Sequence, residues 1–214
     1  MKKLFLASSI NQTAKDIAKQ IGKDPKSLKT AFITTAAEPE GPNDTEWLKN
    51  DRKGLVDTGF DLFDYTITNK TSKQIKEDLE DCKVIHVNGG NTFYLLLQAR
   101  KSGFDKFIRK FVEGGGIYIG SSAGSIIASP NIHIARNIET KIYEKELKTF
   151  EGFNLVDFIT LPHWASEFFK DLYLNHRINI SYVTGNKIVL LTDTQYVFVE
   201  NDMYKIIDVD NKLK

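Results

Sequence analysis

The chain has 214 residues, which is enough for one large domain with a substantial core. Hydrophobic residues make up 41% of it and charged residues 27%, proportions that are typical of a globular protein. The formal net charge of +1 produces no long-range field that would favour nucleic acid or an anionic membrane as a partner.

The N-terminal segment combines two lysines with a short apolar run, Leu4–Ala7. This run is shorter than the roughly 7–15 apolar residues of a signal peptide, so it is better interpreted as a buried first strand. The roughly 18 consecutive apolar residues of a membrane span occur nowhere in the sequence. The single cysteine, Cys82, cannot form an internal disulfide, which fits a reducing compartment. The sequence therefore predicts a cytoplasmic protein without a membrane partner.

Short apolar runs then alternate with segments of helical spacing. Strands are predicted at residues 4–7, 29–35, 63–67, 84–87 and 117–119. Helices are predicted at residues 14–21, 47–54, 72–81, 93–100 and 104–113, and from residue 125 onward. This alternation predicts an α/β fold, a mainly parallel sheet with helices on both faces. The strands that contain Leu4, Ala31, Val84, Ile117 and Ile159 are expected to share that sheet.

The last part of the chain has a different pattern. Residues 188–191, 195–200 and 203–209 are predicted to form short strands joined by tight turns at 192–194 and 201–202. We expect these strands to form an antiparallel C-terminal extension on one edge of the sheet. No linker or repeat divides the chain, so residues 1–214 are expected to form a single domain.

Gly120-Ser121-Ser122-Ala123-Gly124 fits the pattern G-x-S-x-G between a predicted strand and a predicted helix. A nucleophile at the tip of such a turn needs a strained backbone, and small residues on either side let strand and helix approach. The helix N-terminus favours developing negative charge, and the backbone N–H of Ala123 is a natural oxyanion donor. The alternative is a string of small residues that only closes a turn, but the flanking elements favour Ser122 as a nucleophile.

Asn88-Gly89-Gly90-Asn91-Thr92 also lies between a predicted strand and a predicted helix. Paired glycines let backbone N–H groups point into a site without interference from Cβ atoms. The segment is therefore a candidate for the second half of an oxyanion hole, and a plain tight turn is the alternative.

A serine nucleophile needs a base, and four histidines are available: His86, His133, His163 and His176. His163 follows the apolar run 158–162, which places it at the C-terminal end of a strand, where parallel sheets build their sites. His86 lies within a predicted strand and is expected in the core. His133 and His176 lie in polar surroundings and are expected at the surface, so position favours His163 as the base.

Three segments, in this order, resemble the peptidase E family of serine peptidases, whose relatives include cyanophycinase. Residues 87–93 resemble its glycine loop, residues 115–125 its nucleophile segment and residues 161–164 its histidine segment. The resemblance implies a fold similar to class I glutamine amidotransferase domains. It also implies cleavage of dipeptides with N-terminal aspartate, without metal or cofactor.

The resemblance implies roles for particular residues. Ser122 would be the nucleophile and His163 the base. The backbone of Gly89 or Gly90 and that of Ala123 would supply the oxyanion donors.

Substrate binding is assigned to Arg177, which lies after His163 in the segment where the family keeps an arginine. A guanidinium there would suit a substrate carboxylate, and a surface helix arginine is the alternative. Arg136 is the reserve candidate. Asn91, in the glycine loop, is assigned to substrate binding as well.

The third catalytic residue departs from the family pattern. In peptidase E an acidic residue shortly after the nucleophile helix orients the histidine, and the ungapped position falls on Asn137 here. Asparagine can orient an imidazole but cannot stabilise its cation by charge. Glu139 lies two residues further on, so we expect Glu139 to contact His163, with Asn137 as the alternative.

The expected partner is a small peptide substrate, and a homodimer is left open. One alternative function is an amidase or hydrolase of the same fold with another specificity, because a fold does not determine specificity. Another is a catalytically weak binding protein that keeps the pocket, which Asn137 at the orienting position would favour. A nucleotide-binding function ranks low because the sequence has no G-x-x-x-x-G-K-[ST] segment.

Overall fold

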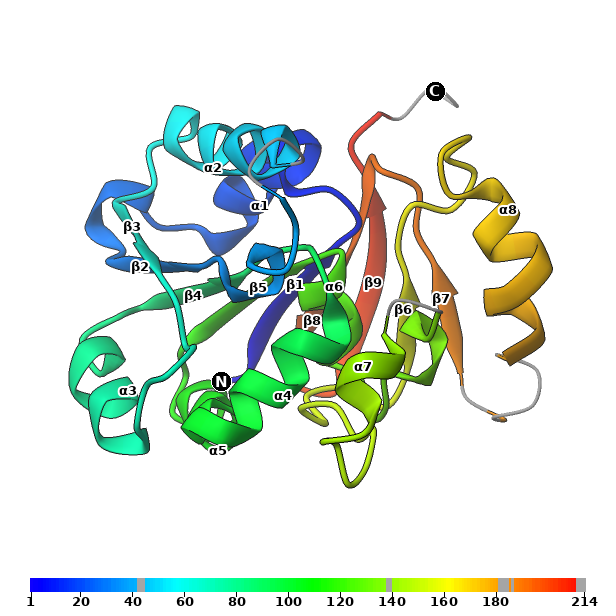
Figure 1. Ribbon diagram of the computed structural model, residues 1–214. Helices are drawn as coiled ribbons and strands as arrows, with labels where there is room; N and C mark the ends of the chain where they lie inside the picture. The colour runs from blue at the N-terminus through cyan, green and yellow to red at the C-terminus, as the bar shows by residue number, and fades with distance from the viewer. Residues whose placement is uncertain (42–44, 138–139, 181–184, 186, 211–214) are drawn as a thin grey trace.

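A seven-stranded sheet forms the centre of the computed structural model, which describes residues 1–41, 45–137, 140–180, 185 and 187–210 (Figure 1). Its strands are β1 (Lys3–Ala7), β2 (Thr30–Ile33), β3 (Leu62–Tyr65), β4 (Val84–Val87), β5 (Ile117–Ser121), β8 (Gln195–Glu200) and β9 (Met203–Asp208). In the order β3-β2-β4-β5-β1 neighbouring strands are parallel, and β8 and β9 continue the sheet antiparallel beyond β1. The predicted mainly parallel fold with an antiparallel C-terminal extension is confirmed.

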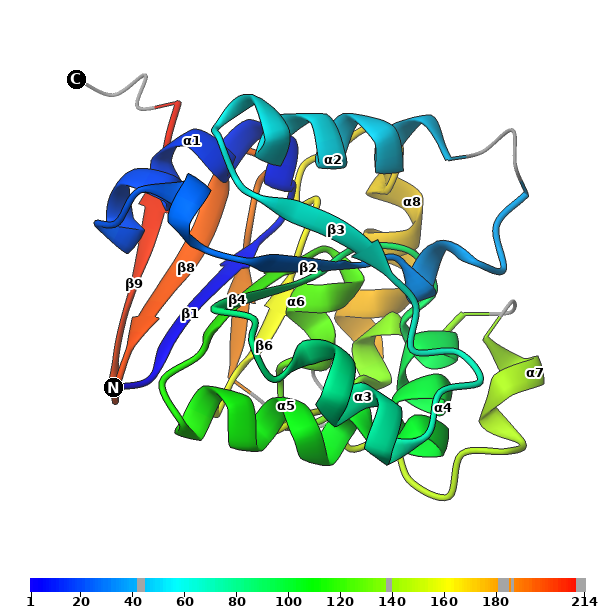
Figure 2. The same ribbon diagram turned by 90° about the vertical axis from the view of Figure 1, so that its left-hand side faces the viewer.

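Helices cover both faces of this sheet (Figure 2). One face carries α1 (Ile10–Ile21) and α2 (Glu46–Asp57), and the other carries α3 (Ser72–Leu79), α4 (Thr92–Ser102), α5 (Phe104–Glu113) and α6 (Ala123–Ile127). Alternate residues of β1 supply the two layers: Leu4 and Leu6 belong to one buried cluster, and Phe5 and Ala7 to the other. The strand is apolar from Leu4 to Ala7 because both of its sides are buried there.

Local signals explain where the helices lie. Phe104, Ile108 and Val112 recur every four residues, so α5 buries one stripe against the sheet. Thr71 and Gln74 form a capping box, with each side chain accepting from the other's backbone N–H, and this fixes the start of α3.

Two strands lie outside the main sheet. β6 (Ile159–Leu161) pairs in parallel with β7 (Ile188–Leu190) to form a separate two-stranded sheet. The predictions that Ile159 joins the main sheet and that residues 188–191 belong to the antiparallel extension are therefore wrong. The hairpin of β8 and β9 extends the main sheet beyond β1, and β6 instead satisfies its backbone groups with β7.

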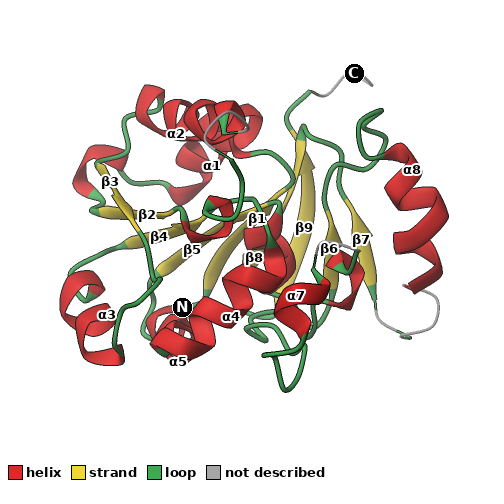
Figure 3. Cartoon of the chain, in the orientation of Figure 1, coloured by secondary structure: helices red, strands yellow, loops and turns green. Residues whose placement is uncertain are grey.

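The remaining helical segments are short or irregular (Figure 3). They are α7 (Lys141–Glu144), α8 (Lys170–Leu172), the π-helical segment Tyr173–Arg177 and the 3₁₀ turns Pro25–Ser27, Thr35–Ala37 and His133–Ala135. Within the described ranges, the helices are too short or too polar to traverse a lipid bilayer.

Candidate active site

The ends of three neighbouring strands assemble the site. β1 lies between β5 and β8, with Ala7 opposite both Ser121 and Tyr196. Ser8 and Ser122 therefore leave the sheet side by side, and the Ser122 N–H donates to the Ala7 carbonyl over 3.1 Å. The turn before β8 reaches the same point because an antiparallel β8 begins where β1 ends.

Ser122 lies on a sharp, strained turn between β5 and α6. Its φ of 50° and ψ of −112° are rare for a residue with a side chain. The flanking glycines are required by close packing: a Cβ on Gly120 would lie 2.5 Å from the Gly124 carbonyl oxygen, and one on Gly124 would lie 1.9 Å from that of Val87. This is the backbone geometry of a nucleophile elbow, with Ser122 directly before the first helical residue, Ala123.

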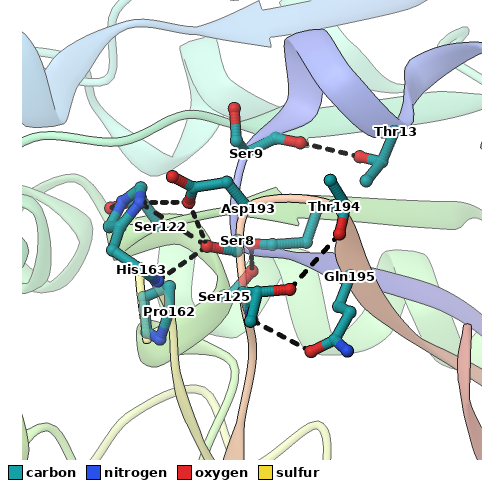
Figure 4. Close-up of polar contacts among 12 residues, drawn as sticks. Ser8, Ser9, Thr13, Ser122, Ser125, Pro162, His163, Asp193, Thr194 and Gln195 are labelled. Carbon is teal, nitrogen blue, oxygen red and sulfur yellow. Dashed lines mark hydrogen bonds and ion pairs between the residues drawn. The ribbon is translucent and has the colours of Figure 1, made fainter. Parts of the chain in front are cut away.

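His163 lies against the Ser122 hydroxyl, as the sequence predicted. It follows β6 with a φ of 62°, and its Nε2 is 3.0 Å from Ser122 Oγ (Figure 4). The imidazole stacks on Phe169, with ring centroids 4.7 Å apart and planes inclined by 15°. Packing and the hydrogen bond together fix the orientation of the ring.

Asp193 holds the other nitrogen of this imidazole, at 2.6 Å between Nδ1 and Oδ1 (Figure 4). The hydrogen bond with His163 lowers the pKa of the Asp193 carboxyl in spite of partial burial. An ionised carboxylate only accepts, so Nδ1 carries the proton and Nε2 of the neutral ring faces the Ser122 hydroxyl as an acceptor. That is the tautomer in which an imidazole can take a proton from a serine.

The orienting position is thus occupied by a residue that the sequence interpretation treated as part of a turn. The Asn137 side chain instead accepts a hydrogen bond from the Thr140 backbone N–H over 3.0 Å. Glu139 lies outside the described residues. The signal available in the sequence was an acidic residue, Asp193, just after the apolar run 188–191.

Gly89 is the glycine-loop residue nearest to the nucleophile. A Cβ added to it would lie 3.2 Å from Ser122 Cβ and 3.6 Å from Ser122 Oγ. Any side chain there would crowd the serine, so the backbone lies beside the reacting hydroxyl. Ala123, the first residue of α6, directly follows Ser122, so Gly89 and the N-terminal end of α6 both lie beside the nucleophile.

The next two residues of the glycine loop face away from this point and hold the loop in place. Gly90 has a φ of 122°, and a Cβ on it would lie 2.2 Å from the Ala36 carbonyl oxygen. Asn91 donates its N–H to that same carbonyl over 2.7 Å, and its side chain caps α4 by accepting from Tyr94 N–H over 2.9 Å. The structure therefore shows Asn91 as the cap of α4, and its contact with substrate stays a prediction.

Arg177 is buried, with 9% of its surface exposed, so the alternative of a surface arginine is wrong. It donates from Nη1 to the Tyr173 hydroxyl over 3.1 Å, and its guanidinium lies over the rings of Tyr173 and Phe169. Burial lowers the pKa of Arg177 from its usual value. Phe169 stacks on His163, so a single ring links the arginine to the base.

The other candidates for binding and catalysis are engaged elsewhere. Arg136 makes a two-pronged ion pair with Glu144, from Nε and Nη2. His176 Nε2 lies 2.7 Å from the Arg136 carbonyl oxygen, and His133 packs on Phe150. The expected core position of His86 is confirmed, since it is fully buried in β4 and burial lowers its pKa to about 3.

The pattern that defines peptidase family S51 matches residues 4–207. The chain belongs to peptidase family S51. It is therefore a peptidase, a hydrolase.

Relatives of this S51 chain support the resemblance to peptidase E. An uncharacterized peptidase of Listeria monocytogenes is 31% identical over 202 residues, which cover 93% of this chain and 95% of that protein. An uncharacterized peptidase of Pasteurella multocida is 29% identical over 213 residues, covering 99% and 100% of the two chains. Peptidase E of Escherichia coli is 33% identical over 88 residues, which cover 41% of this chain and 37% of that protein.

Solved structures agree with this membership. A crystal structure of a Listeria monocytogenes protein described as a candidate peptidase E has a TM-score of 0.86 and 29% identity, covering 98% of this chain and 100% of that one. A peptidase from an acI-B1 actinobacterium has a TM-score of 0.72 at 16% identity, covering 97% and 88%, and shares the fold. The predicted membership of the peptidase E family is confirmed.

This S51 peptidase also has a buried carboxyl behind the site. Asp51, on α2, is 9% exposed, and burial raises its pKa to about 7. The Asn11 N–H and the Asn88 side chain oppose that rise, and the charge of Asp193 adds to it. The folded protein therefore keeps the proton between about pH 4 and 7, whereas the unfolded chain releases it.

Replacing this carboxyl should stabilise the protein at high pH. The contribution of Asp51 to the free energy of unfolding should fall as the pH rises from about 4 to 7, because ionising Asp51 is costly only in the folded state. The lowered pKa of His86 gives a contribution of opposite sign over much of this range, but that contribution is present in wild type and variant alike. Asp51→Asn should remove that loss, with a gain on the order of 1–4 kcal/mol at pH 8 and little gain at pH 4.

Urea unfolding of both proteins at pH 4 and pH 8 measures the effect. Asp57→Asn is the matched control, because Asp57 is exposed on the same helix and pairs with Lys53. An advantage of Asp51→Asn that is equal at both pH values would contradict the assignment.

Proposed function

We propose that this protein is a serine peptidase that cleaves dipeptides with N-terminal aspartate through an acyl-enzyme on Ser122. The observation that carries the proposal is the hydrogen-bonded line from Ser122 Oγ through His163 to Asp193, with contacts of 3.0 Å and 2.6 Å. Nucleophile, base and orienting acid at these distances are the arrangement of serine hydrolases, which recurs on unrelated folds. Family membership supports the same chemistry.

In the first half-reaction, Ser122 Oγ attacks the carbonyl carbon of the scissile bond while His163 Nε2 takes the hydroxyl proton. The carbonyl oxygen becomes an oxyanion, and the backbone N–H groups of Gly89 and Ala123 are the donors proposed for it. Asp193 stabilises the imidazolium and holds its ring in place. His163 then gives the proton to the leaving amine, the C–N bond breaks, and the acyl group stays on Ser122.

In the second half-reaction, water replaces the amine. His163 removes a proton from the water, whose oxygen attacks the acyl carbon. The collapse of the second oxyanion returns the proton to Ser122 Oγ and releases the carboxylic acid. The net change is one peptide bond and one water converted into an acid and an amine.

Arg177 is the residue proposed to select aspartate. A substrate carboxylate entering beside His163 meets the stack of Phe169, Tyr173 and Arg177. A guanidinium held at 9% exposure is poorly hydrated, so pairing with an anion is more favourable than it would be for a surface arginine. The pair with Glu144 makes Arg136 a weaker candidate for this role.

The alternative of a catalytically weak binding protein rested on an asparagine at the orienting position. The contact between the Asp193 carboxylate and His163 Nδ1 supports an active enzyme rather than that alternative. A hydrolase of the same fold with another specificity differs from our proposal only in the substrate side chain, so the substrate must be tested directly.

The specificity test compares Asp-Leu, Asn-Leu and Leu-Leu. Wild type should prefer Asp-Leu. Arg177→Met should lower kcat/KM for Asp-Leu, with a loss of transition-state stabilisation on the order of 2–5 kcal/mol, because a desolvated charge pair is lost. The neutral dipeptides should lose far less. Methionine keeps much of the buried volume beneath the guanidinium, which limits damage to the stack.

Arg136→Ala is the matched control, because it removes an exposed arginine that pairs with Glu144. It should leave the ranking of the three dipeptides unchanged. Equal losses on all three dipeptides in Arg177→Met would make Arg177 structural. A wild-type preference for a neutral residue would remove the aspartyl specificity and leave the serine peptidase in place.

A further inference from the structure

We propose that Ser8 is a positioning residue of this site, whose single hydroxyl holds the Asp193 carboxylate and the His163 backbone together. The inference rests on the proposed function, since it presupposes that Ser122, His163 and Asp193 carry out the reaction. Ser8 acts through its two neighbours and does not touch the substrate.

The fold puts Ser8 at the centre of the assembly. It directly follows β1, is fully buried, and donates its own N–H to the Gln195 carbonyl over 3.2 Å. On one side of β1 lies the strand that ends at the nucleophile, and on the other the strand that begins after Asp193. Ser8 is thus anchored by the main sheet, whereas His163 and Asp193 come from loops next to the small sheet.

Both hydrogen-bonding functions of the hydroxyl are used (Figure 4). Ser8 Oγ donates to Asp193 Oδ1 over 2.7 Å and accepts from the His163 backbone N–H over 2.7 Å. A serine hydroxyl has one hydrogen and two lone pairs, so these contacts are complementary. Alanine would leave both the Asp193 carboxylate and the His163 N–H without this partner.

Each partner needs such a support. His163 has a φ of 62°, a strained conformation for a non-glycine residue that persists only where its surroundings hold it. The Asp193 side chain is 35% exposed in a turn, so its rotamer is less constrained by packing. The bond from Ser8 also helps to lower the pKa of Asp193, which keeps the carboxylate charged beside the base.

The expected consequence is a loss of turnover without a loss of binding. Ser8→Ala should lower kcat for the preferred dipeptide roughly ten- to hundredfold, the scale of a hydrogen bond to a charged group, while KM stays within about twofold. Ser8→Thr keeps the Oγ and should restore most of kcat. Ser9→Ala is the matched control, because the neighbouring serine makes no side-chain capping bond to α1, and it should behave as wild type.

Two further readouts do not depend on knowing the peptide substrate. A fluorophosphonate probe reports the reactivity of Ser122, and a downfield proton NMR signal reports the His163 Nδ1–H···Asp193 bond. Ser8→Ala should label more slowly by a similar factor, and its downfield signal should move or broaden. Circular dichroism and thermal unfolding check that the variant is folded. If it is not, Ser8→Cys, which keeps a weaker donor, should show the same changes at smaller size.

The outcomes separate the two proposals. A wild type that is not labelled by the probe and shows no downfield signal would overturn the proposed function itself. A wild type that labels, together with a folded Ser8→Ala of equal labelling rate, equal kcat and unchanged signal, would overturn the role of Ser8 alone. A rise in KM with unchanged kcat would also overturn it, because that pattern belongs to a substrate contact.

Discussion

Ser122→Ala should abolish peptide hydrolysis, lowering kcat by on the order of 10⁶-fold, while the protein remains folded. The other hydroxyls nearby are committed to other partners. Ser121 Oγ donates to Asn88 Oδ1 over 2.7 Å, and Ser125 Oγ donates to the Ala7 and Gly120 carbonyls. Neither can take over the attack without breaking a buried bond.

The measurement is kcat on the preferred dipeptide, together with the mass of the intact protein after treatment with a fluorophosphonate. Wild type should gain one adduct and Ser122→Ala none. Ser121→Ala is the matched control, because it removes the adjacent hydroxyl and should keep the adduct. Full activity in Ser122→Ala would move the role of nucleophile elsewhere, with Ser121 the first residue to test.

The nucleophile turn could be predicted because its constraints are local in the sequence. Gly120 and Gly124 lie two residues on either side of Ser122, so the pattern can be read from one short segment, although the backbone that requires Gly124 is that of Val87 on the neighbouring strand β4. His163 could be placed from position as well, because it lies two residues after the end of an apolar strand. In both cases one element and its end were enough to locate the side chain.

Asp193 could not be placed in the same way, because its contact with His163 depends on tertiary pairing. The two residues are 30 apart and meet because β6 and β7 lie side by side, with Leu191 N–H donating to the Leu161 carbonyl and Trp164 N–H to that of Leu191. The sequence assigned residues 188–191 to an antiparallel edge, which would have carried the following turn away from the base. The wrong assignment of residues 188–191 to the main sheet therefore also explains why Asp193 was not expected beside His163.

The burial of two charged side chains also could not be predicted from the sequence. Arg177 and Asp51 are each 9% exposed, although charged residues usually lie at the surface. Arg177 is covered by Phe169 and Tyr173 through a π-helical segment, an irregularity that no helical periodicity predicts. These two side chains became distinguishable from ordinary surface charges only once the layers around them were known.

Asp193→Asn should lower kcat by about 10³- to 10⁴-fold with little change in KM. The amide has nearly the shape of the carboxylate, so the fold and the contact with Ser8 can persist. It carries no charge, however, and cannot stabilise the imidazolium that forms when His163 takes the Ser122 proton. If the amide presents its NH₂ group to Nδ1, the ring also adopts the wrong tautomer, with its proton on Nε2 facing the serine.

Three variants measured side by side decide which residue orients the base: Asp193→Asn, Asn137→Ala and Glu139→Gln. Asn137 is bonded to Thr140, so Asn137→Ala should cost some stability in that turn but leave kcat near the wild-type value. Glu139→Gln should likewise be kinetically silent, because both nitrogens of His163 already have partners. A large loss of kcat in Glu139→Gln combined with a silent Asp193→Asn would assign the orienting role to Glu139. It would also mean that the 2.6 Å contact between His163 and Asp193 is not the one used in catalysis.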